Sequence, residues 1–261
     1  MLAVLDLFTE EHAILSADEI TGRLKYTRPT GYRYVRELVA AGLLVRAPNG
    51  YALGPRIIEL DWLIRTRDPL LTASRDAVRE LSQRLGCDIT QMGLYGERIV
   101  TIHHERGPEP LEISFDRGRP MPLFRGAPSK AILAFLPRAR LERLYGKHYR
   151  KGFPKFFKEM QAIRKAGYAA SFGELDPGKV GIGAPVFRRD RTVAGSLCLV
   201  LTQVRYETAN SDLLIEKLLD SAARISEALE PVDAEPGARR KPAVKSTASP
   251  HRSAVRPPER P

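Results

Sequence analysis

The sequence of 261 residues has little of what several large classes of protein depend on. It contains two cysteines, Cys87 and Cys198, which lie far apart in apolar stretches and in no metal-ligand spacing. This excludes a disulfide framework and a cysteine-based metal site. No apolar run approaches the ~20 residues of a bilayer-spanning helix, and the first residues lack the basic region of a secretory signal. These absences predict a cytoplasmic protein without a membrane partner.

Catalytic motifs are missing as well. The sequence contains no Ser-His-Asp arrangement and no zinc-protease motif. His103 and His104 fall on a predicted strand, so their rings face opposite sides and cannot form one simple metal site. Residues 178–183 resemble a phosphate loop, but with reversed spacing and leading into a strand, so we interpret them as a tight loop. We predict no catalytic residue, no metal and no cofactor.

Positive charge is abundant. The formal net charge is +11 and the pI is about 9.8, which favours a polyanionic partner. Residues 23–56 contain seven Lys or Arg and one acid, Glu37. Residues 231–261 contain seven prolines, seven Lys or Arg and three acids with almost nothing to bury, which predicts a disordered basic tail.

Residues 16–42 have the pattern of two short helices. Ser16 and Glu19 are spaced as a capping box, in which each side chain satisfies a backbone N–H of the first turn. A second helix is predicted to begin at Thr27, an N-cap residue type, and to end at Gly42. Its apolar residues recur at the spacing of one buried stripe: Gly31, Tyr34, Val35, Leu38 and Val39. The opposite face of this helix is basic and polar.

Two short strands, residues 43–46 and 51–53, follow around the turn-forming sequence Ala-Pro-Asn-Gly. Helix, short turn, basic helix and hairpin form the order of a winged helix-turn-helix, whose second helix enters the DNA major groove. A small helical hairpin with a merely solvated basic face is the alternative. The occurrence of all these signals in order favours DNA binding. Residues 1–8, in which Leu2, Leu5 and Phe8 are at helical spacing, are predicted to form the first helix of the same unit.

Residues 57–67 are predicted to form a linker helix with a broad apolar surface. A dimer partner would bury this surface. The next helix runs from residue 69 to about residue 85. Strands are then predicted at residues 88–94, 98–104, 111–115, 168–172, 182–187 and 192–201, with helices at 129–136, 138–146, 156–166 and 210–229. We therefore expect an α+β protein with domains at residues 1–56, 57–67 (linker), 68–230 and 231–261 (tail).

Several sequence segments resemble the IclR family of bacterial transcriptional regulators over nearly all of residues 1–230. They are LAVLDLF at 2–8, RELVAAGL at 36–43, YALGPR at 51–56, PL at 122–123, KAILAFLP at 130–137, GY at 167–168, ELDPG at 174–178 and APVF at 184–187. The resemblance implies an N-terminal winged helix, a linker helix and a GAF-like C-terminal domain that binds a small effector. It also implies homodimers or homotetramers on palindromic double-stranded DNA operators.

The predicted DNA-contacting residues combine the basic helix face with the positions that the resemblance implies. Arginine in a groove reads guanine or binds phosphate, and the sequence does not distinguish the two roles. The predicted set is Arg28, Thr30, Tyr32, Arg33, Arg36 and Arg46.

The effector site implied by the resemblance departs from the pattern of members that bind small carboxylates. Those members offer backbone amides before the helix at residue 130, and Asp, Cys and two Ser side chains from the sheet. The matching positions here are Ala127 and Pro128, then Ser171, Gly181, Leu197 and Leu199. Because Pro128 has no N–H and leucine replaces hydroxyl twice, we expect a larger, more apolar effector, aromatic or acyl. Its predicted polar anchor is Arg125 or Ser171.

The sequence thus predicts a sequence-specific transcription factor, repressor or activator, controlled by a small organic effector. Three alternatives remain open at this point. In the first, the C-terminal domain has lost ligand binding and only dimerises. In the second, the protein is an architectural DNA binder without a ligand response. In the third, it is a small-molecule enzyme with an accessory DNA-binding domain.

Overall fold

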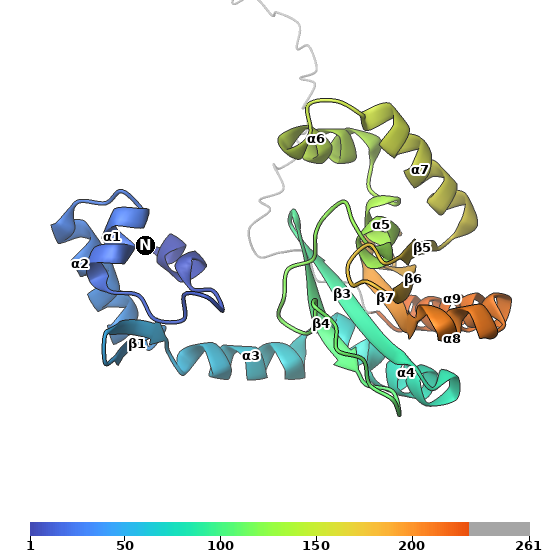
Figure 1. Cartoon of the computed structure of the whole chain (residues 1–261), viewed down its shortest axis with the longest axis horizontal. Helices are drawn as coiled ribbons and strands as arrows, with labels where there is room; N and C mark the ends of the chain where they lie inside the picture. The colour runs from blue at the N-terminus through green and yellow to red at the C-terminus, as the bar shows by residue number, and fades with distance from the viewer. Residues whose placement is uncertain (230–261) are drawn as a thin grey trace, which may run out of the picture. The chain divides into compact units, whose positions relative to one another are not determined.

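The computed structural model describes residues 1–229 (Figure 1). The prediction of a disordered tail at residues 231–261 lies outside these residues. The N-terminal part contains a 3₁₀ helix η1, two helices and a hairpin, and the linker helix α3 follows. Their bounds are η1 Leu2–Leu7, α1 Ala17–Arg23, α2 Arg28–Ala40, β1 Leu44–Ala47, β2 Gly50–Leu53 and α3 Arg56–Arg67.

The predicted start of α1 is confirmed in both halves. The Glu19 N–H donates to Ser16 Oγ at 3.2 Å, and the Ser16 N–H donates to Glu19 Oε2 at 2.8 Å. Helices α1 and α2 approach so closely that a Cβ built on Gly31 would lie 2.1 Å from Thr21 Oγ1. Glycine is therefore required where the two helices cross. Gly42 follows the end of α2 with φ +72°, a left-handed conformation that glycine adopts without strain.

Two local predictions need correction. Thr27 stands at the N-cap position of α2, but its hydroxyl bonds to Thr30 Oγ1 at 3.0 Å and caps no backbone N–H. The first helix is a 3₁₀ helix with Val4 buried, rather than an α-helix, because six residues supply few α-helical hydrogen bonds. Both segments still complete the small core of the N-terminal part, which contains Val4, Leu15, Ile20, Val35, Leu38 and Leu44.

The C-terminal part is built on one antiparallel sheet in the order β4-β3-β7-β6-β5. Helices α4 and α9 cover one face of the sheet and α5 covers the other, with α6 and α7 beyond α5 (Figure 1). The strands are β3 Asp88–Tyr95, β4 Arg98–Glu105, β5 Ala169–Phe172, β6 Lys179–Phe187 and β7 Val193–Thr202. The helices are α4 Pro69–Leu85, α5 Ala127–Leu133, α6 Arg138–His148, α7 Phe153–Ala166, α8 Gln203–Thr208 and α9 Ser211–Ala228.

Side chains alternate along β7 between the two faces of the sheet. Leu197 and Leu199 are fully buried in the core between the sheet and the pair α4 and α9. Cys198 and Val200 face the other side, where α5 and α6 close a second core. Leu197 and Leu199 therefore pack in the first core, whereas Cys198 and Val200 face the second.

Residues 111–115 form no strand, contrary to the prediction. Two prolines stand just before them, Pro108 and Pro110, and lack the N–H of a strand ladder. The outer edge of β4 is met instead by residues 118–121, where the Met121 N–H donates to Ile99 O at 2.8 Å. Helix α8 was not predicted, and Gly181 and Gly183 lie in strand β6 rather than in a tight loop.

Strand β6 has an unusual second half. Strand β5 pairs with it only as far as Gly183, so Pro185 lies beyond the end of β5. Pro185 has no N–H to leave unpaired there, and the Phe187 N–H donates to Ser226 Oγ of α9 at 2.9 Å. The edge of β6 beyond the end of β5 therefore has few free backbone N–H groups.

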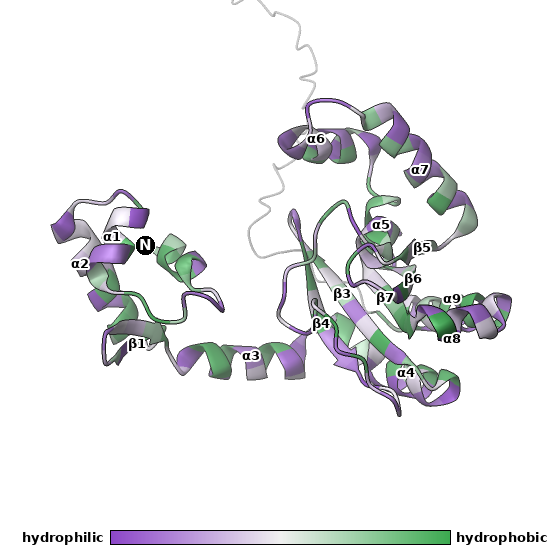
Figure 2. Ribbon diagram, in the orientation of Figure 1, coloured by the Kyte–Doolittle hydropathy of each residue, from purple (hydrophilic) through white to green (hydrophobic). Residues whose placement is uncertain are grey.

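The linker helix α3 is apolar but buries none of its residues. Ile58 is 73% exposed, Trp62 62% and Ile64 50%, and Figure 2 shows the apolar residues along it in green. Among the described residues, no helix is long and apolar enough to cross a membrane.

Candidate DNA-reading surface and effector pocket

The outer face of α2 and the hairpin form one groove. Arg33 and Arg36 come from α2 and Arg46 from β1, and Tyr32 lies at the side of the same groove. Four of the six predicted DNA-contacting residues are thus brought together. All four side chains are exposed, and the fold does not use them in its core. Arg36 has one long ion pair, with Glu37 at 3.7 Å, and no acid is ion-paired with Arg33 or Arg46 among the described residues. Exposed guanidinium groups of this kind are suited to base edges and phosphates.

The other two predicted residues, Arg28 and Thr30, have partners inside the protein. The Arg28 guanidinium donates twice to Asp18, with both N···O distances 3.0 Å, and the Tyr32 hydroxyl donates to the same carboxylate at 3.2 Å. The hydrogen bond from Arg28 is the main reason that the pKa of Asp18 lies below its usual range. Arg28 therefore ties α1 to α2 in the free protein, and DNA would have to compete for it.

A pocket of about 450 Å³, open solvent at its mouth included, lies between the sheet and α5. Its walls are mainly apolar, as a site for an apolar ligand requires. The lining residues are Thr90, Met92, Ile113, Phe115, Met121, Pro128, Ser171, Glu174, Leu175, Asp176, Lys179, Val180, Gly181, Cys198 and Val200.

Two of the six residues expected at the effector site, Ser171 and Gly181, line this pocket. Leu197 and Leu199 do not, because strand alternation places them on the opposite face of the sheet. In β7 the residues that line this pocket are Cys198 and Val200, the neighbours of the two expected leucines. Burial raises the pKa of Cys198 to about 12, so this wall presents a neutral thiol.

The remaining two expected residues, Ala127 and Arg125, are engaged by the protein itself. The Ala127 N–H donates to Ser171 Oγ at 3.0 Å, and the Arg125 guanidinium donates to the carbonyl oxygen of Glu174. Neither residue is part of the pocket wall. Ala127 lies behind Pro128, at the first turn of α5.

Glu174, which the sequence analysis did not single out, occupies the start of α5. Its carboxylate accepts from the Gly126 N–H at 2.9 Å and from Lys130 Nζ at 2.8 Å. Burial raises the pKa of Glu174, but these hydrogen bonds outweigh it, so the pKa lies below the usual range. Lys130 is also ion-paired with Glu159 at 2.9 Å. A carboxylate of the protein thus already satisfies the Gly126 N–H and the Lys130 ammonium at the start of α5.

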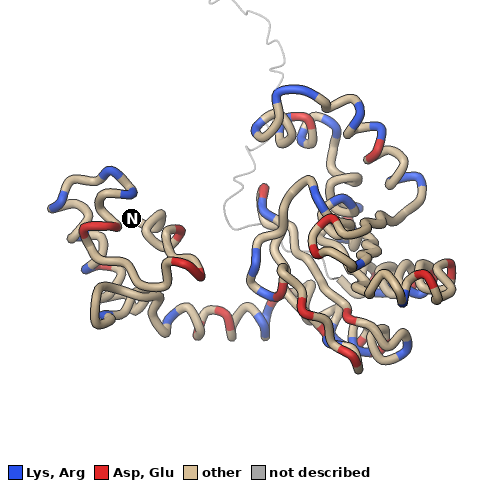
Figure 3. The backbone as a smooth tube through the Cα atoms, in the orientation of Figure 1, with Lys and Arg blue, Asp and Glu red and all other residues tan. Residues whose placement is uncertain are grey.

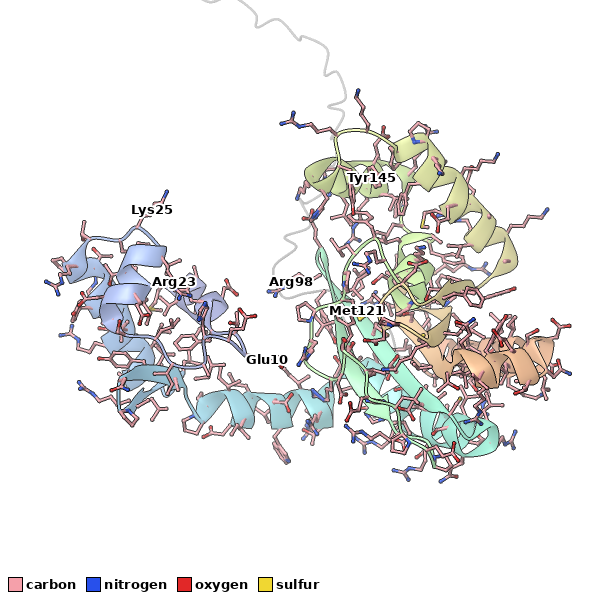
Figure 4. The ribbon with its side chains drawn as sticks, in the orientation of Figure 1. Glu10, Arg23, Lys25, Arg98, Met121 and Tyr145 are labelled. Carbon is pink, nitrogen blue, oxygen red and sulfur yellow. The ribbon has the colours of Figure 1, made fainter. Side chains whose placement is uncertain are left out.

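Residues 106–121, which we term the cover segment, close the pocket on the side of β4. Ile113, Phe115 and Met121 of this segment line the pocket, and Met121 is labelled in Figure 4. At the C-terminal end of the segment, the Arg117 guanidinium donates to Asp61 of the linker helix at 2.8 Å. The wall of the pocket and the linker helix are thus joined by one ion pair.

A buried cluster holds the cover segment to the sheet. The two ring nitrogens of His104 lie 2.9 Å from Asp88 Oδ2 and 2.9 Å from Asp116 Oδ1. Asp88 is fully buried and also accepts from the N–H groups of Gly107 and Leu111. Asp88 and Asp116 are distant from His104 in sequence, so no local pattern predicts this cluster. Within residues 1–229 no group of His, Cys, Asp or Glu has an arrangement suited to a metal ion.

An exposed basic helix and wing, joined through a linker to an α+β domain with a small-molecule pocket, define a ligand-sensing DNA-binding regulator. The comparison with family models gives the same answer. Residues 65–227 match the model described as bacterial transcriptional regulator IclR C-terminal. The chain belongs to the IclR family of transcriptional regulators, and it is a DNA-binding transcriptional regulator.

Curated and solved relatives agree with this assignment. The chain is similar to the HTH-type transcriptional regulator KipR of Bacillus subtilis, with 26% identity over 86% of this chain and 93% of that one. A putative IclR regulator from Silicibacter sp. TM1040 has the same fold, with a TM-score of 0.76, 22% identity, and coverage of 87% and 94%. An IclR homologue from Microbacterium hydrocarbonoxydans, solved with 4-hydroxybenzoate, has a TM-score of 0.70 at 21% identity, with coverage of 87% and 96%.

Proposed function

We propose that residues 1–56 read a palindromic operator, that residues 68–230 bind an aromatic or acyl effector, and that residues 57–67 couple the two. The pocket beneath the cover segment is the observation on which this proposal rests, because its walls are mainly apolar and it opens between the sheet and α5. The family relative solved with 4-hydroxybenzoate supports an aromatic effector. The proposed location is the cytoplasm, and no catalytic role is proposed.

The polar end of the effector is expected to meet Lys179. Arg125 and Ser171, the anchors expected from sequence, are both engaged in internal hydrogen bonds. Among the residues that line the described pocket, Lys179 is the one cation, and no described acid forms an ion pair with it. An aromatic acid would therefore place its ring against Phe115 and Val200 and its carboxylate at Lys179.

Coupling is proposed to run through the cover segment. A ligand that contacts Phe115 acts two residues from Arg117, whose ion pair with Asp61 holds the linker helix. Allosteric coupling energies of this kind are typically ~1–3 kcal/mol. A shift of the cover segment that breaks or strengthens the Arg117–Asp61 pair would change how the linker helix is held and so contribute to the coupling.

The exposed apolar residues of α3 are proposed to pack against a second copy of the chain. A palindromic operator requires two winged helices related by a two-fold axis. Ile58, Trp62 and Ile64 together leave an apolar face uncovered, which a partner helix would bury. Sedimentation of the full chain would distinguish this dimer from a tetramer.

The test is binding to DNA upstream of the gene for this protein, near physiological salt and with excess competitor DNA, in the presence of aromatic and acyl compounds. We expect a specific complex whose affinity changes with one class of compound. The Arg117→Ala variant should bind operator and effector but lose the response, whereas Arg106→Ala, a neighbouring cation of the cover segment, should keep it. A specific complex that no compound changes, with no ligand-induced thermal shift, would instead support an architectural DNA binder.

The Lys179→Met variant tests the proposed carboxylate anchor separately from the apolar contacts of the ring. It should weaken binding of an aromatic acid and leave binding of the corresponding neutral ester unchanged. Equal loss for acid and ester would contradict the assignment of Lys179 as the anchor. Glyoxylate binding as strong as that of any aromatic acid would contradict an apolar pocket.

A further inference from the structure

The positive charge of this protein is distributed unevenly between its parts. Residues 1–67, which contain the winged helix and the linker, have nine Lys or Arg and eight acids, a net charge of +1. Residues 138–165, which form α6, α7 and the turn between them, have ten Lys or Arg and two acids, a net charge of +8. Figure 3 shows this concentration of blue along α6 and α7. The excess charge therefore lies away from the DNA-reading groove.

Most of these cations have no counter-charge. On this surface, which we term the α6–α7 surface, Glu159 is already ion-paired with Lys130, and Lys147 is ion-paired with Glu97 at 2.6 Å. Arg138 packs over the ring of Phe157, and Arg164 donates to the carbonyl oxygens of Ala134 and Leu136. Six further cations are exposed and form neither an ion pair nor a side-chain hydrogen bond with any described residue. They are Arg143, Arg150, Lys151, Lys155, Lys158 and Lys165.

The lysines of α7 are arranged on one face of the helix. Lys155, Lys158 and Lys165 recur at intervals of three and seven residues, which places them on one stripe. Phe156 and Met160, which are buried, define the opposite face. The stripe is thus turned fully to solvent, with a length of about 15 Å at the usual rise per residue.

An aromatic cluster makes the frame beneath this surface rigid. The ring of Tyr145, labelled in Figure 4, stacks on Phe156 with centroids 4.9 Å apart, and Phe124 packs edge-on against Phe156 at 5.4 Å. Tyr149, in the turn, lies 4.8 Å from Tyr145. Helices and turn are therefore held together, and a rigid display of charge loses less entropy on binding than a flexible one.

We propose that the α6–α7 surface binds the phosphate backbone of duplex DNA, as a sequence-independent contact additional to the winged helix. Phosphate contacts by Lys and Arg supply most of the non-specific affinity of DNA-binding proteins. A winged-helix part with a net charge of only +1 supplies little long-range attraction. Once the winged helix is bound, neighbouring duplex is present at a high effective concentration.

A membrane surface is the other polyanion to consider. Interfacial binding requires exposed apolar side chains beside the cations. In residues 138–165 the one large hydrophobic residue that is prominently exposed is Tyr149, at 45%. The composition of the surface therefore favours DNA.

The test is the salt dependence of binding to a random-sequence duplex several helical turns long, which requires neither an operator nor an effector. The variant is Lys151→Gln/Lys155→Gln/Lys158→Gln in the full chain. The matched control is Arg79→Gln/Arg189→Gln/Arg191→Gln, which removes the same charge from exposed cations on other elements. All six side chains are exposed, so both variants should melt at the temperature of the wild type.

The slope of log K against log salt concentration should fall by roughly two to three in the lysine variant, since each lost phosphate contact contributes about 0.9. The control should leave the slope nearly unchanged. Equal slopes for the two variants would show that only total charge matters and would overturn the proposal. So would a lysine variant that binds DNA as the wild type does but no longer binds vesicles of phosphatidylglycerol.

Discussion

The groove on α2 and the wall of the pocket are both candidate functional surfaces. They differ in whether their side chains also belong to a hydrophobic core. The groove is made of side chains such as Arg33, Arg36 and Arg46, which are exposed and absent from the N-terminal core. The pocket is made of side chains such as Cys198 and Met121, which also belong to the core of the C-terminal part.

This difference decides what substitutions do in the two regions. In the groove, recognition and stability are separate properties, and a side chain can be changed without cost to the fold. In the pocket, the side chains that would contact a ligand also stabilise the core. Only substitutions at the open side of the pocket are therefore expected to change ligand binding without changing stability. The following three predictions test this contrast, beginning with the largest expected effect.

Leu197→Ala should lower the free energy of unfolding by about 2–5 kcal/mol, because it opens a cavity in the fully packed face of the sheet. Val200→Ala, three residues along the same strand, should cost only about 1 kcal/mol, because its side chain already borders open space. Denaturant unfolding measures both. Equal costs would mean that the pocket is part of a closed core.

Arg33→Ala should reduce operator affinity by roughly 1–3 kcal/mol and relax specificity at one base pair, if the guanidinium reads a base. The melting temperature should not change, since Arg33 is exposed and outside the core. Arg23→Ala removes an exposed cation of α1 outside the groove and is the control. Titration of operator and point-mutated duplexes measures the effect, and uniform weakening on every sequence would reassign Arg33 to a phosphate.

Ser16→Ala should destabilise the winged helix by about 1 kcal/mol, because the first turn of α1 loses its side-chain cap. Thr27→Ala, at the equivalent position of α2, should cost less, because Thr27 caps no backbone N–H. Thermal melting of the full chain compares them. A greater loss for Thr27→Ala would show that its bond to Thr30 stabilises the helix more than the capping box does.

The winged helix could be predicted from the sequence because its determinants are local. The capping box at Ser16, the glycine at Gly42 and the Asn-Gly turn each act within a few residues. The family and the fold class were confirmed by the comparisons. Even here Arg28 was assigned only to DNA, because its pairing with Asp18 depends on how α1 crosses α2.

The pocket was predicted less well because its determinants are distant in sequence. A shift of one residue in β7 exchanged Leu197 and Leu199 for Cys198 and Val200, since strand side chains alternate between faces. The bond from Gly126 to Glu174 spans 48 residues and follows no local pattern. The concentration of positive charge on α6 and α7, in contrast, can be read from the sequence alone, because residues 138–165 contain ten Lys or Arg and two acids.

The short pairing of β5 has a consequence for the protein at high concentration. Open strand edges recruit strands from other chains and so lead to aggregation or domain swapping. Here the free half of the β6 edge carries Pro185, which has no N–H, and Phe187, whose N–H is occupied by Ser226. That half of the edge cannot act as a template for another strand. Strand pairing between two copies of the chain is therefore not expected along that half of the β6 edge.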